Sequence, residues 1–284
     1  MNDKKPFDFN IVRLFLLQVM LFFAVIVPSF WFFYFIKRLY TNEYCMHTNN
    51  DIIFSVNHIG FIMDGNRRWA RAEGVSLNRG YYEGVKKLFE MVDLCLKENI
   101  KEVTVYGLAL ANLQQRSRTE INIIFEVAMT ALNQKEDWII NQGIKINIIG
   151  DVNELSPQTQ EKIEDITKKT ENGKVLILNI LFGYCPDEDV LYGVKKIHEK
   201  VLNNELNIEK LTPKMVRNHM RSHTVSDIDL IIRTGGYERL SGFVPIQSAQ
   251  AEIIIVKDLW PSLKTTYVRS LIRSFHQRKR NLGK

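Results

Sequence analysis

The chain has 284 residues, 45% of them hydrophobic, which is enough for one large domain, or two small ones, with a core of its own. Its three cysteines, Cys45, Cys95 and Cys185, are scattered without a C-x-x-C pair, which argues against a disulfide framework and a zinc site. The formal net charge of +6 suits a nucleic acid, an anionic lipid or a phosphorylated substrate, but no basic stripe interleaved with aromatic residues is present, so we expect no nucleic-acid partner.

An apolar segment near the N-terminus runs from Leu14 to Ile36 without a charged residue. As a helix it would be about 34 Å long, which is enough to cross a bilayer. Trp31 and Tyr34 lie near its end, where aromatic residues of the membrane interface are expected, and two basic residues follow. The segment therefore predicts contact with membrane lipid.

A cleaved signal peptide is the alternative, but the apolar segment is too long and no small-residue cleavage site follows it. We expect residues 1–38 to form a membrane anchor, a single N-terminal transmembrane helix. A polar linker over residues 39–53 would join it to a domain over residues 54–284. Pro28 leaves open a helix that enters one leaflet and returns. Basic residues on both sides leave the orientation open, although free cysteines favour a cytosolic domain.

Six apolar runs are typical of buried strands, and they occupy residues 58–63, 102–110, 144–150, 174–183, 228–233 and 252–257. The segments between them have the helical period, as over residues 85–96 and 121–132, and Ser156-Pro157 and Thr212-Pro213 have the pattern of helix starts. This alternation predicts a single α/β domain with a mostly parallel central sheet flanked by helices.

The first strand ends within the sequence HIGFIMDGNRRWA, residues 58–70. Asp64-Gly65 closes the strand, and Arg67, Arg68 and Arg71 follow in what we expect to be the first turns of a helix. A carboxylate beside a glycine turn, helix amides and guanidinium groups suits a diphosphate bound with Mg2+. The alternative is an ordinary turn followed by a solvated basic face.

A second anion-binding cluster is expected after the strand over residues 228–233. Arg233 ends that strand, and Arg239 and Ser241 follow the Gly235-Gly236 pair, which lets the backbone approach a ligand. Ligands of parallel sheets bind at the carboxyl ends of the strands, so we expect this cluster at the same edge as the first.

Glu252 opens the last predicted strand. It would complete a metal site with Asp64 if the two strands are neighbours, since hard oxygen ligands suit Mg2+. A solvated residue at the start of a strand is the alternative for this position.

These motifs together are similar to those of a known family. The sequences HIGFIMDGNRRWA, VTVYGLALAN and LIIRTGGYERLSGF, and the terminal RKRNLGK, resemble in order and separation the cis-prenyltransferases, meaning undecaprenyl and dehydrodolichyl diphosphate synthases. The likeness runs from about residue 56 to the C-terminus. It implies successive condensation of isopentenyl diphosphate onto an allylic diphosphate such as farnesyl diphosphate. It also implies a long polyprenyl product, made for dolichol synthesis and glycosylation at the endoplasmic reticulum membrane.

The resemblance implies a role for each matching residue. Asp64 would be the catalytic carboxylate and a ligand of Mg2+, with Glu252 as the second metal ligand, and Asn112 would take part in proton handling. The implied substrate-binding residues begin with Gly65, Asn66, Arg67 and Arg68, which would cradle the allylic diphosphate, and Trp69, which would pack beside that site. The others are Arg116, if one residue is inserted before it, and Arg233, Arg239 and Ser241 for isopentenyl diphosphate.

The chain also departs from the family pattern at several positions, most of which carry polar side chains in the family. These positions are Tyr81 in place of histidine, Ala109 and Ala111 in place of serine and glutamate, Leu113 in place of an aromatic residue, Tyr237 in place of glutamate and Asn281 in place of arginine. Family members act as homodimers or as heteromers with a second related subunit. The departures therefore leave open a non-catalytic, membrane-anchored regulatory subunit as the alternative function.

Overall fold

The computed structural model describes residues 55–152 and 155–276, which belong to a compact unit over residues 53–284. Within these residues, no helix combines the length and the apolar character that a membrane crossing requires. The predicted anchor over residues 1–38, with its expected lipid contact, and the linker over residues 39–53 lie outside the described residues, as does Asn281.

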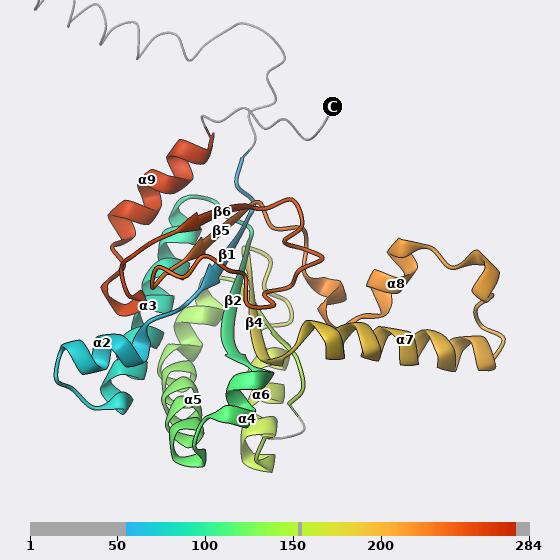
Figure 1. The fold of residues 1–284 in the computed structure, drawn as a ribbon, viewed down its shortest axis with the longest axis horizontal. Helices are drawn as coiled ribbons and strands as arrows, with labels where there is room; N and C mark the ends of the chain where they lie inside the picture. Colours follow the sequence, from blue (N-terminus) through green and yellow to red (C-terminus); the bar gives the residue numbers. More distant parts are fainter. Residues whose placement is uncertain (1–54, 153–154, 277–284) are drawn as a thin grey trace, which may run out of the picture. The chain divides into compact units, whose positions relative to one another are not determined.

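The described residues form one sheet of six parallel strands in the order β3-β4-β2-β1-β5-β6 (Figure 1). This confirms the predicted α/β domain with a parallel sheet, and each predicted strand is present. The strands are β1 (His58–Ile62), β2 (Glu102–Ala109), β3 (Ile144–Ile149), β4 (Leu176–Tyr184), β5 (Leu230–Arg233) and β6 (Glu252–Ile255).

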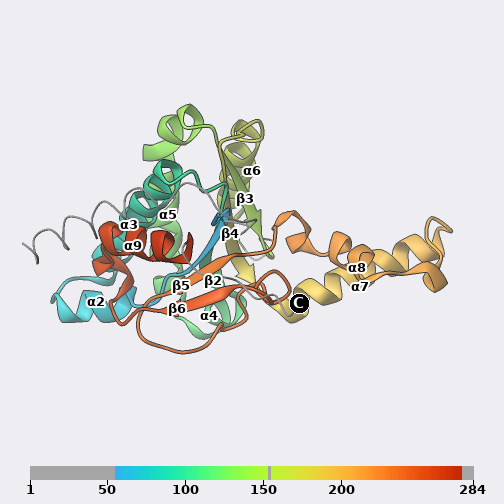
Figure 2. The same cartoon turned by 90° about the horizontal axis from the view of Figure 1, so that it is seen from above.

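Helices flank this sheet (Figure 2). They are α2 (Asn66–Ala72), α3 (Leu77–Lys97), α4 (Leu110–Gln115), α5 (Arg118–Asn141), α6 (Pro157–Lys169), α7 (Pro186–Leu202), α8 (Pro213–His219) and α9 (Thr265–His276). The predicted helix starts are confirmed, because the hydroxyl groups of Ser156 and Thr212 accept hydrogen bonds from the first turns of α6 and α8. Each start has proline as its first helical residue.

The main hydrophobic core lies on one face of the sheet, under α3, α5, α6 and α9. Alternate residues of the strands, such as Ile59 and Phe61 of β1, pack there against Met91 of α3 and Ile272 of α9. The opposite face carries a smaller cluster in which Phe243, from the loop between β5 and β6, packs on the sheet. Both faces are covered, which explains why the strands read as nearly continuous apolar runs.

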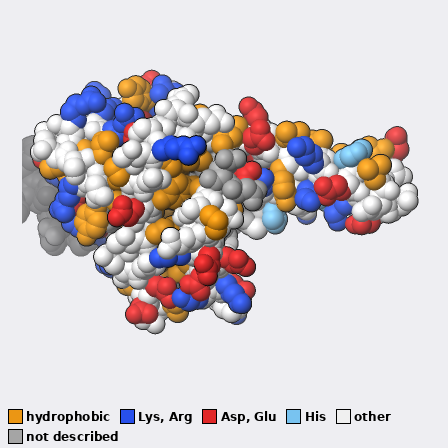
Figure 3. Space-filling model, turned by 90° about the horizontal axis from the view of Figure 1, so that it is seen from below, with side chains coloured by type: hydrophobic (Ala, Val, Ile, Leu, Met, Phe, Trp, Pro, Cys, Tyr) orange, Lys and Arg blue, Asp and Glu red, His pale blue; other side chains and the backbone are white. Residues whose placement is uncertain are grey.

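Helices α7 and α8 project beyond the sheet (Figures 1 and 2). The face of the molecule seen in Figure 3 shows hydrophobic side chains scattered between charged ones along this projection. On α7, Val190, Leu191 and Val194 are 42–51% exposed. An apolar helix face left open in this way is typical of a surface that another protein covers.

A buried polar network lies at the amino-terminal end of the sheet. His58, which is 2% exposed, contacts Ser226 Oγ through Nδ1 at 3.0 Å and Thr104 Oγ1 through Nε2 at 2.7 Å. Glu102 accepts hydrogen bonds from Ser226 Oγ at 2.6 Å and from Asn179 Nδ2 at 2.7 Å. The network ties β1, β2 and β4 to the segment that precedes β5, and satisfied polar groups of this kind specify a single arrangement of strands.

Candidate active site

The carboxyl ends of β1 and β5 meet at one edge of the sheet, as the sequence predicts. The strands are neighbours, with Ile62 paired to Arg233. Thr234 fastens the backbone of Asp64, because its Oγ1 accepts a hydrogen bond from the Asp64 N–H at 2.9 Å and donates one to the Asp64 carbonyl at 2.7 Å. The backbone N–H of Trp260 donates a hydrogen bond to the same carbonyl at 3.0 Å. Two distant segments of the chain therefore fix the position of Asp64.

The carboxylate of Asp64 lies between two guanidinium groups. Nη2 of Arg68, one turn along in α2, donates to Oδ1 at 3.0 Å, and Nη2 of Arg233 donates to Oδ2 at 3.0 Å. The side chain of Arg233 is 4% exposed, whereas those of Asp64 and Arg68 are 29% and 38% exposed. One cation is thus fixed in the interior while the carboxylate and the other cation stay accessible to an anionic ligand.

A second cluster follows β5 directly. Nη1 of Arg233 donates to Ser241 Oγ at 2.8 Å and to the carbonyl of Arg239, and Nε of Arg239 donates to the same Ser241 Oγ at 3.3 Å. Ser241 has a φ of 52°, an uncommon conformation for a residue with a side chain and one that is often found at functional sites. The structure therefore brings Arg233, Arg239 and Ser241 together, and Arg233 joins this cluster to Asp64.

A third group of polar side chains surrounds Glu120, near the start of α5. Glu120 is 7% exposed, and its Oε1 accepts a hydrogen bond from the Tyr81 hydroxyl at 2.5 Å and lies 3.6 Å from Nε of both Arg67 and Arg116. Nη1 of Arg116 also donates to the Tyr81 hydroxyl at 3.0 Å. Burial, together with the hydrogen bond to Glu120, raises the pKa of Tyr81, so the phenol keeps its proton.

Four further candidates lie at the same edge of the sheet. Gly65 has a φ of 117°, and an added Cβ would lie 2.8 Å from the Leu259 side chain, so this turn requires glycine. Asn66 and Trp69 lie on α2, and Asn66 Oδ1 is buried without a hydrogen-bond partner among the described residues. Asn112 is half-buried on α4, which directly follows β2.

Glu252 lies at the opposite end of the sheet from Asp64. It pairs with Leu230, which pairs with Ile59, five residues before Asp64. At a rise of about 3.3 Å per residue, Glu252 is about 16 Å from the level of Asp64 along the strands. Each ligand atom of a Mg2+ ion lies about 2.1 Å from the ion, so two ligand atoms of one ion are at most about 4 Å apart. Within one chain, Asp64 and Glu252 therefore do not share a metal ion, because the start of one parallel strand is far from the end of another. The role of Glu252 as a metal ligand stays a prediction.

Sequence reasoning missed two residues of the site, Thr234 and Glu120. Thr234 directly follows Arg233, and only the register of β5 against β1 shows that its hydroxyl fastens Asp64. A signal for Glu120 is present in the sequence, because it lies four residues after Arg116, a spacing that brings opposite charges together at a helix start.

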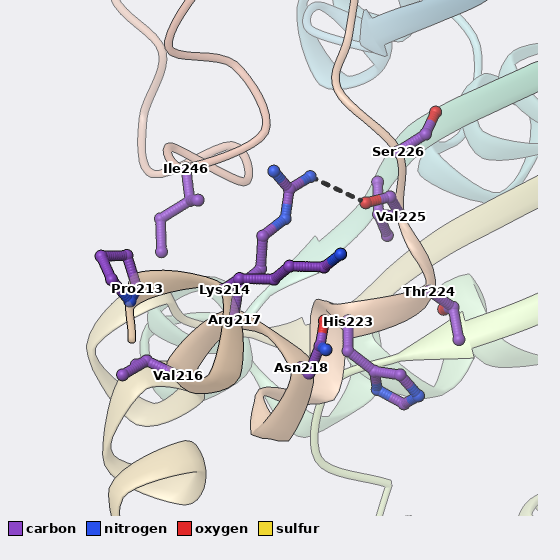
Figure 4. Close-up of a pocket in the computed structure, with 10 residues that line it drawn as sticks. All are labelled: Pro213, Lys214, Val216, Arg217, Asn218, His223, Thr224, Val225, Ser226 and Ile246. Carbon is purple, nitrogen blue, oxygen red and sulfur yellow. Dashed lines mark hydrogen bonds between the residues drawn. The ribbon is translucent and has the colours of Figure 1, made fainter. Parts of the chain in front are cut away.

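A cavity of about 920 Å3 lies apart from these residues, between α8, the segment 223–226 and Ile246 (Figure 4). Arg217 lies inside it, donating a hydrogen bond to the Val225 carbonyl at 3.2 Å. Its wall includes Ser226, which belongs to the polar network at the amino-terminal end of the sheet. None of the predicted site residues lines this cavity.

Comparison with known proteins points to one family. The family model described as undecaprenyl diphosphate synthase matches residues 62–283. A tritrans,polycis-undecaprenyl-diphosphate synthase (geranylgeranyl-diphosphate specific) from Picrophilus torridus is 31% identical and covers 88% of this chain and 97% of its own length. An isoprenyl transferase from Campylobacter jejuni is 32% identical, with 81% of this chain and 99% of its own length covered.

Solved structures share the fold. The structure of lavandulyl diphosphate synthase from Lavandula x intermedia in complex with dimethylallyl diphosphate matches with a TM-score of 0.77 and 24% identity, and 81% of this chain and 99% of that one are covered. The structure of a probable undecaprenyl diphosphate synthase from Campylobacter jejuni matches with a TM-score of 0.67 and 26% identity, over 81% and 100% of the two chains.

These relatives correct the predicted location at the endoplasmic reticulum membrane. The matched enzymes from Picrophilus torridus, Shewanella oneidensis and Photorhabdus laumondii belong to archaea and bacteria, which lack that organelle. The prediction came from the apolar N-terminal segment together with the resemblance to dehydrodolichyl diphosphate synthases, and that segment lies outside both the family match and the described residues.

Proposed function

Because the chain belongs to the undecaprenyl diphosphate synthase family of cis-prenyltransferases, we propose that it condenses isopentenyl diphosphate onto an allylic diphosphate and releases a long polyprenyl diphosphate. The observation that carries the proposal is the position of Asp64 between Arg68 and Arg233, with a second basic cluster beside it. Two diphosphates need two sets of cations, and this edge of the sheet provides them.

The residues at this edge fit a magnesium ion. Mg2+ is usually held by one or two carboxylates together with substrate phosphates, and Asp64 is an accessible carboxylate between two anion-binding clusters. Asp64 would hold the ion, and a bound Mg2+ would neutralise charge on the leaving diphosphate. With Glu252 at the far end of the sheet, Asp64 is the protein ligand that we propose within one chain.

The arginines would bind the two diphosphates and stabilise the charge that develops during the reaction. Arg67 and Arg68 of α2 would bind the allylic diphosphate, and the buried Arg233, with Arg239 and Ser241, would bind isopentenyl diphosphate. As the bond from the allylic carbon to oxygen breaks, negative charge grows on the leaving diphosphate, and fixed guanidinium groups stabilise that charge without reorganising. The new carbon–carbon bond then forms from the isopentenyl double bond, and a proton leaves the adjacent carbon.

The proton step is proposed for the neighbourhood of Asn112. It lies on α4, which leads directly to Arg116 and the group around Glu120. Tyr81 stays protonated there, so it can donate a hydrogen bond but cannot accept a proton as a histidine would. The departing diphosphate is the base that we propose for the proton.

An apolar lining beside the site suits the growing chain. Leu108 and Phe182 form a small cluster with the half-buried Leu113, Ile124 and Phe125, next to the carboxyl ends of β2 and β4. Each isoprene unit adds five carbons, so its exposure to water would cost about 4 kcal/mol. We propose that the polyprenyl product grows along this lining. The length of the product, the choice of farnesyl or geranylgeranyl diphosphate as acceptor, and a use of the product in dolichol synthesis stay predictions.

The test is an incorporation assay. The purified full chain, with detergent, Mg2+, farnesyl diphosphate and labelled isopentenyl diphosphate, is expected to yield chain-extended product. The same assay with geranylgeranyl diphosphate ranks the two acceptors. Failure to incorporate label with either acceptor would contradict autonomous catalysis, and recovery on addition of a related second subunit would favour the non-catalytic role.

The exposed apolar side chains of α7 support assembly with a second chain. Val190, Leu191 and Val194 share this helix, and burying them against another protein would remove apolar surface from water. We propose a dimer, with the homodimer and the heteromer as its two forms. Light scattering of the purified chain distinguishes them, since a homodimer has twice the mass of the chain without any added protein.

A further inference from the structure

The ring of Tyr237 lies among three guanidinium groups. The Cζ atoms of Arg239, Arg68 and Arg233 lie 4.7, 4.9 and 5.9 Å from the ring centre. All three fall within the roughly 6 Å range of cation–π attraction. The side chain of Tyr237 is 45% exposed, so the ring borders solvent at the open edge of the site.

These arginines come from different parts of the chain and serve different clusters. Arg68 belongs to α2, Arg233 ends β5, and Arg239 lies in the loop that follows. Asp64 pairs with the first two, and Ser241 holds the third. Tyr237 contacts all three, so it joins the proposed cradle of the allylic diphosphate to that of isopentenyl diphosphate.

The charges around the ring are unbalanced. Arg68 and Arg233 share the one carboxylate of Asp64, and Arg239 forms no ion pair within the part of the chain that the structure describes, so the cluster is left positively charged. Nε of the buried Arg233 has no hydrogen-bond partner among the described residues, so a donor remains at the centre of the cluster. Like charges repel, and the attraction of each guanidinium group to the ring offsets part of that repulsion.

A phenol ring and a carboxylate would act differently at this position. A glutamate, which the family pattern has here, would form ion pairs with the arginines and cancel part of their charge. The π face of tyrosine attracts guanidinium groups without neutralising them. The full positive charge is then available to a ligand.

We propose that Tyr237 is a positioning residue that holds Arg68, Arg233 and Arg239 together as a cationic cradle, and that this cradle binds a diphosphate without needing a divalent cation. The proposal deepens the proposed function, on which it rests. Magnesium would then serve the bond-breaking step more than the capture of the ligand, because the arginines already supply the charge that a diphosphate requires.

Calorimetry with inorganic pyrophosphate tests this on the full chain, once in EDTA and once in Mg2+. The wild type is expected to bind under both conditions, and Tyr237→Phe, which keeps the ring, to bind equally well. Tyr237→Leu is expected to weaken binding in EDTA by about two- to fivefold, the value of an exposed cation–π contact. Tyr237→Glu is expected to weaken it by about tenfold or more, with partial recovery in Mg2+.

Tyr82→Leu is the matched control. Tyr82 is 39% exposed and contacts one guanidinium, that of Arg79 at 5.4 Å, on α3. Its loss is expected to leave pyrophosphate binding unchanged, and thermal unfolding verifies that each variant folds.

The outcomes distinguish a failure of this inference from a failure of the proposed prenyl-transfer function. Wild-type affinity of Tyr237→Leu and Tyr237→Glu in EDTA would overturn the inference, as would a wild type that binds pyrophosphate in Mg2+ alone, and both leave the enzymatic proposal standing. A wild type that binds no pyrophosphate under either condition and incorporates no label would overturn both.

Discussion

Arg233 donates a hydrogen bond of 3.0 Å to Asp64, a residue 169 positions earlier in the chain. The contact exists because β5 and β1 are parallel neighbours, so their last residues reach the same edge of the sheet. It places a buried cation against an accessible carboxylate at the centre of the proposed site. The predictions below test this contact and the groups around it.

Replacing Asp64 by asparagine keeps the shape of the side chain and removes its charge. We expect prenyl transfer to fall by at least about a hundredfold, as when a group that stabilises a transition state is lost. Pyrophosphate binding in EDTA is expected to tighten, because a negative charge leaves the arginine cluster. Label incorporation and calorimetry measure the two effects. Asp93→Asn, which affects an exposed ion pair with Lys97 on α3, is the control, and an active Asp64→Asn would refute the assigned role.

Replacing Gly235 by alanine is expected to displace Arg68. An added Cβ would lie 2.2 Å from Arg68 Nη2, and Gly235 has a φ of 83°. We expect activity to fall about tenfold or more, because a misplaced guanidinium no longer binds the diphosphate. Gly74→Ala is the control, since its φ is 66° but nothing lies within 4 Å of the added atom. Equal activity losses in the two variants would indicate backbone strain alone.

Replacing Glu120 by glutamine removes the charge that orients Arg67 and Arg116. We expect the KM for the allylic diphosphate to rise by about tenfold, with a smaller change in the KM for isopentenyl diphosphate, because the freed arginines lose their fixed geometry. Steady-state kinetics with each substrate varied in turn measures this. Glu98→Gln, which breaks a 2.7 Å ion pair with Arg269 away from the site, should leave both constants unchanged. A rise in the KM for isopentenyl diphosphate alone would mean that Arg67 and Arg116 serve that substrate and not the allylic diphosphate.

His58 makes stability depend on pH. Burial lowers its pKa, against the opposing effects of Glu102 and Asp229, so the unfolded chain binds more protons below about pH 6.5. The free energy of unfolding is therefore expected to fall by on the order of 1 kcal/mol as the pH falls from 7.5 to 5.5. Urea unfolding measures it, and His58→Gln should reduce the dependence. The exposed His198→Gln should retain it, and a dependence that survives in His58→Gln would contradict the assignment.

The fold was largely predictable from local patterns. All six apolar runs became strands, because strands covered on both faces are apolar at nearly every position. Ser156 and Thr212 marked helix starts for a local reason, the pairing of a hydroxyl group with first-turn amides. The meeting of Asp64 with Arg233 also followed, since both end strands of one parallel sheet.

The parts that depend on register and on side-chain packing were not predictable. Glu252 was expected beside Asp64, but strand order alone does not show that one begins its strand while the other ends its own. The contacts of Tyr237 with three arginines depend on a loop that returns over the sheet edge, and no spacing in the sequence encodes them.

The two ends of the sheet hold different kinds of polar groups. At the amino-terminal end, His58, Glu102 and Thr104 are buried and paired with each other or their neighbours, whereas Asp64 and Arg68 at the carboxyl end stay open to solvent. In laboratory evolution of this protein, selection for stability and selection for substrate choice should therefore act on different residues. Substitutions that raise heat tolerance would accumulate around the first group and those that alter substrate choice around the second, and improvements from the two screens could be combined with little interference.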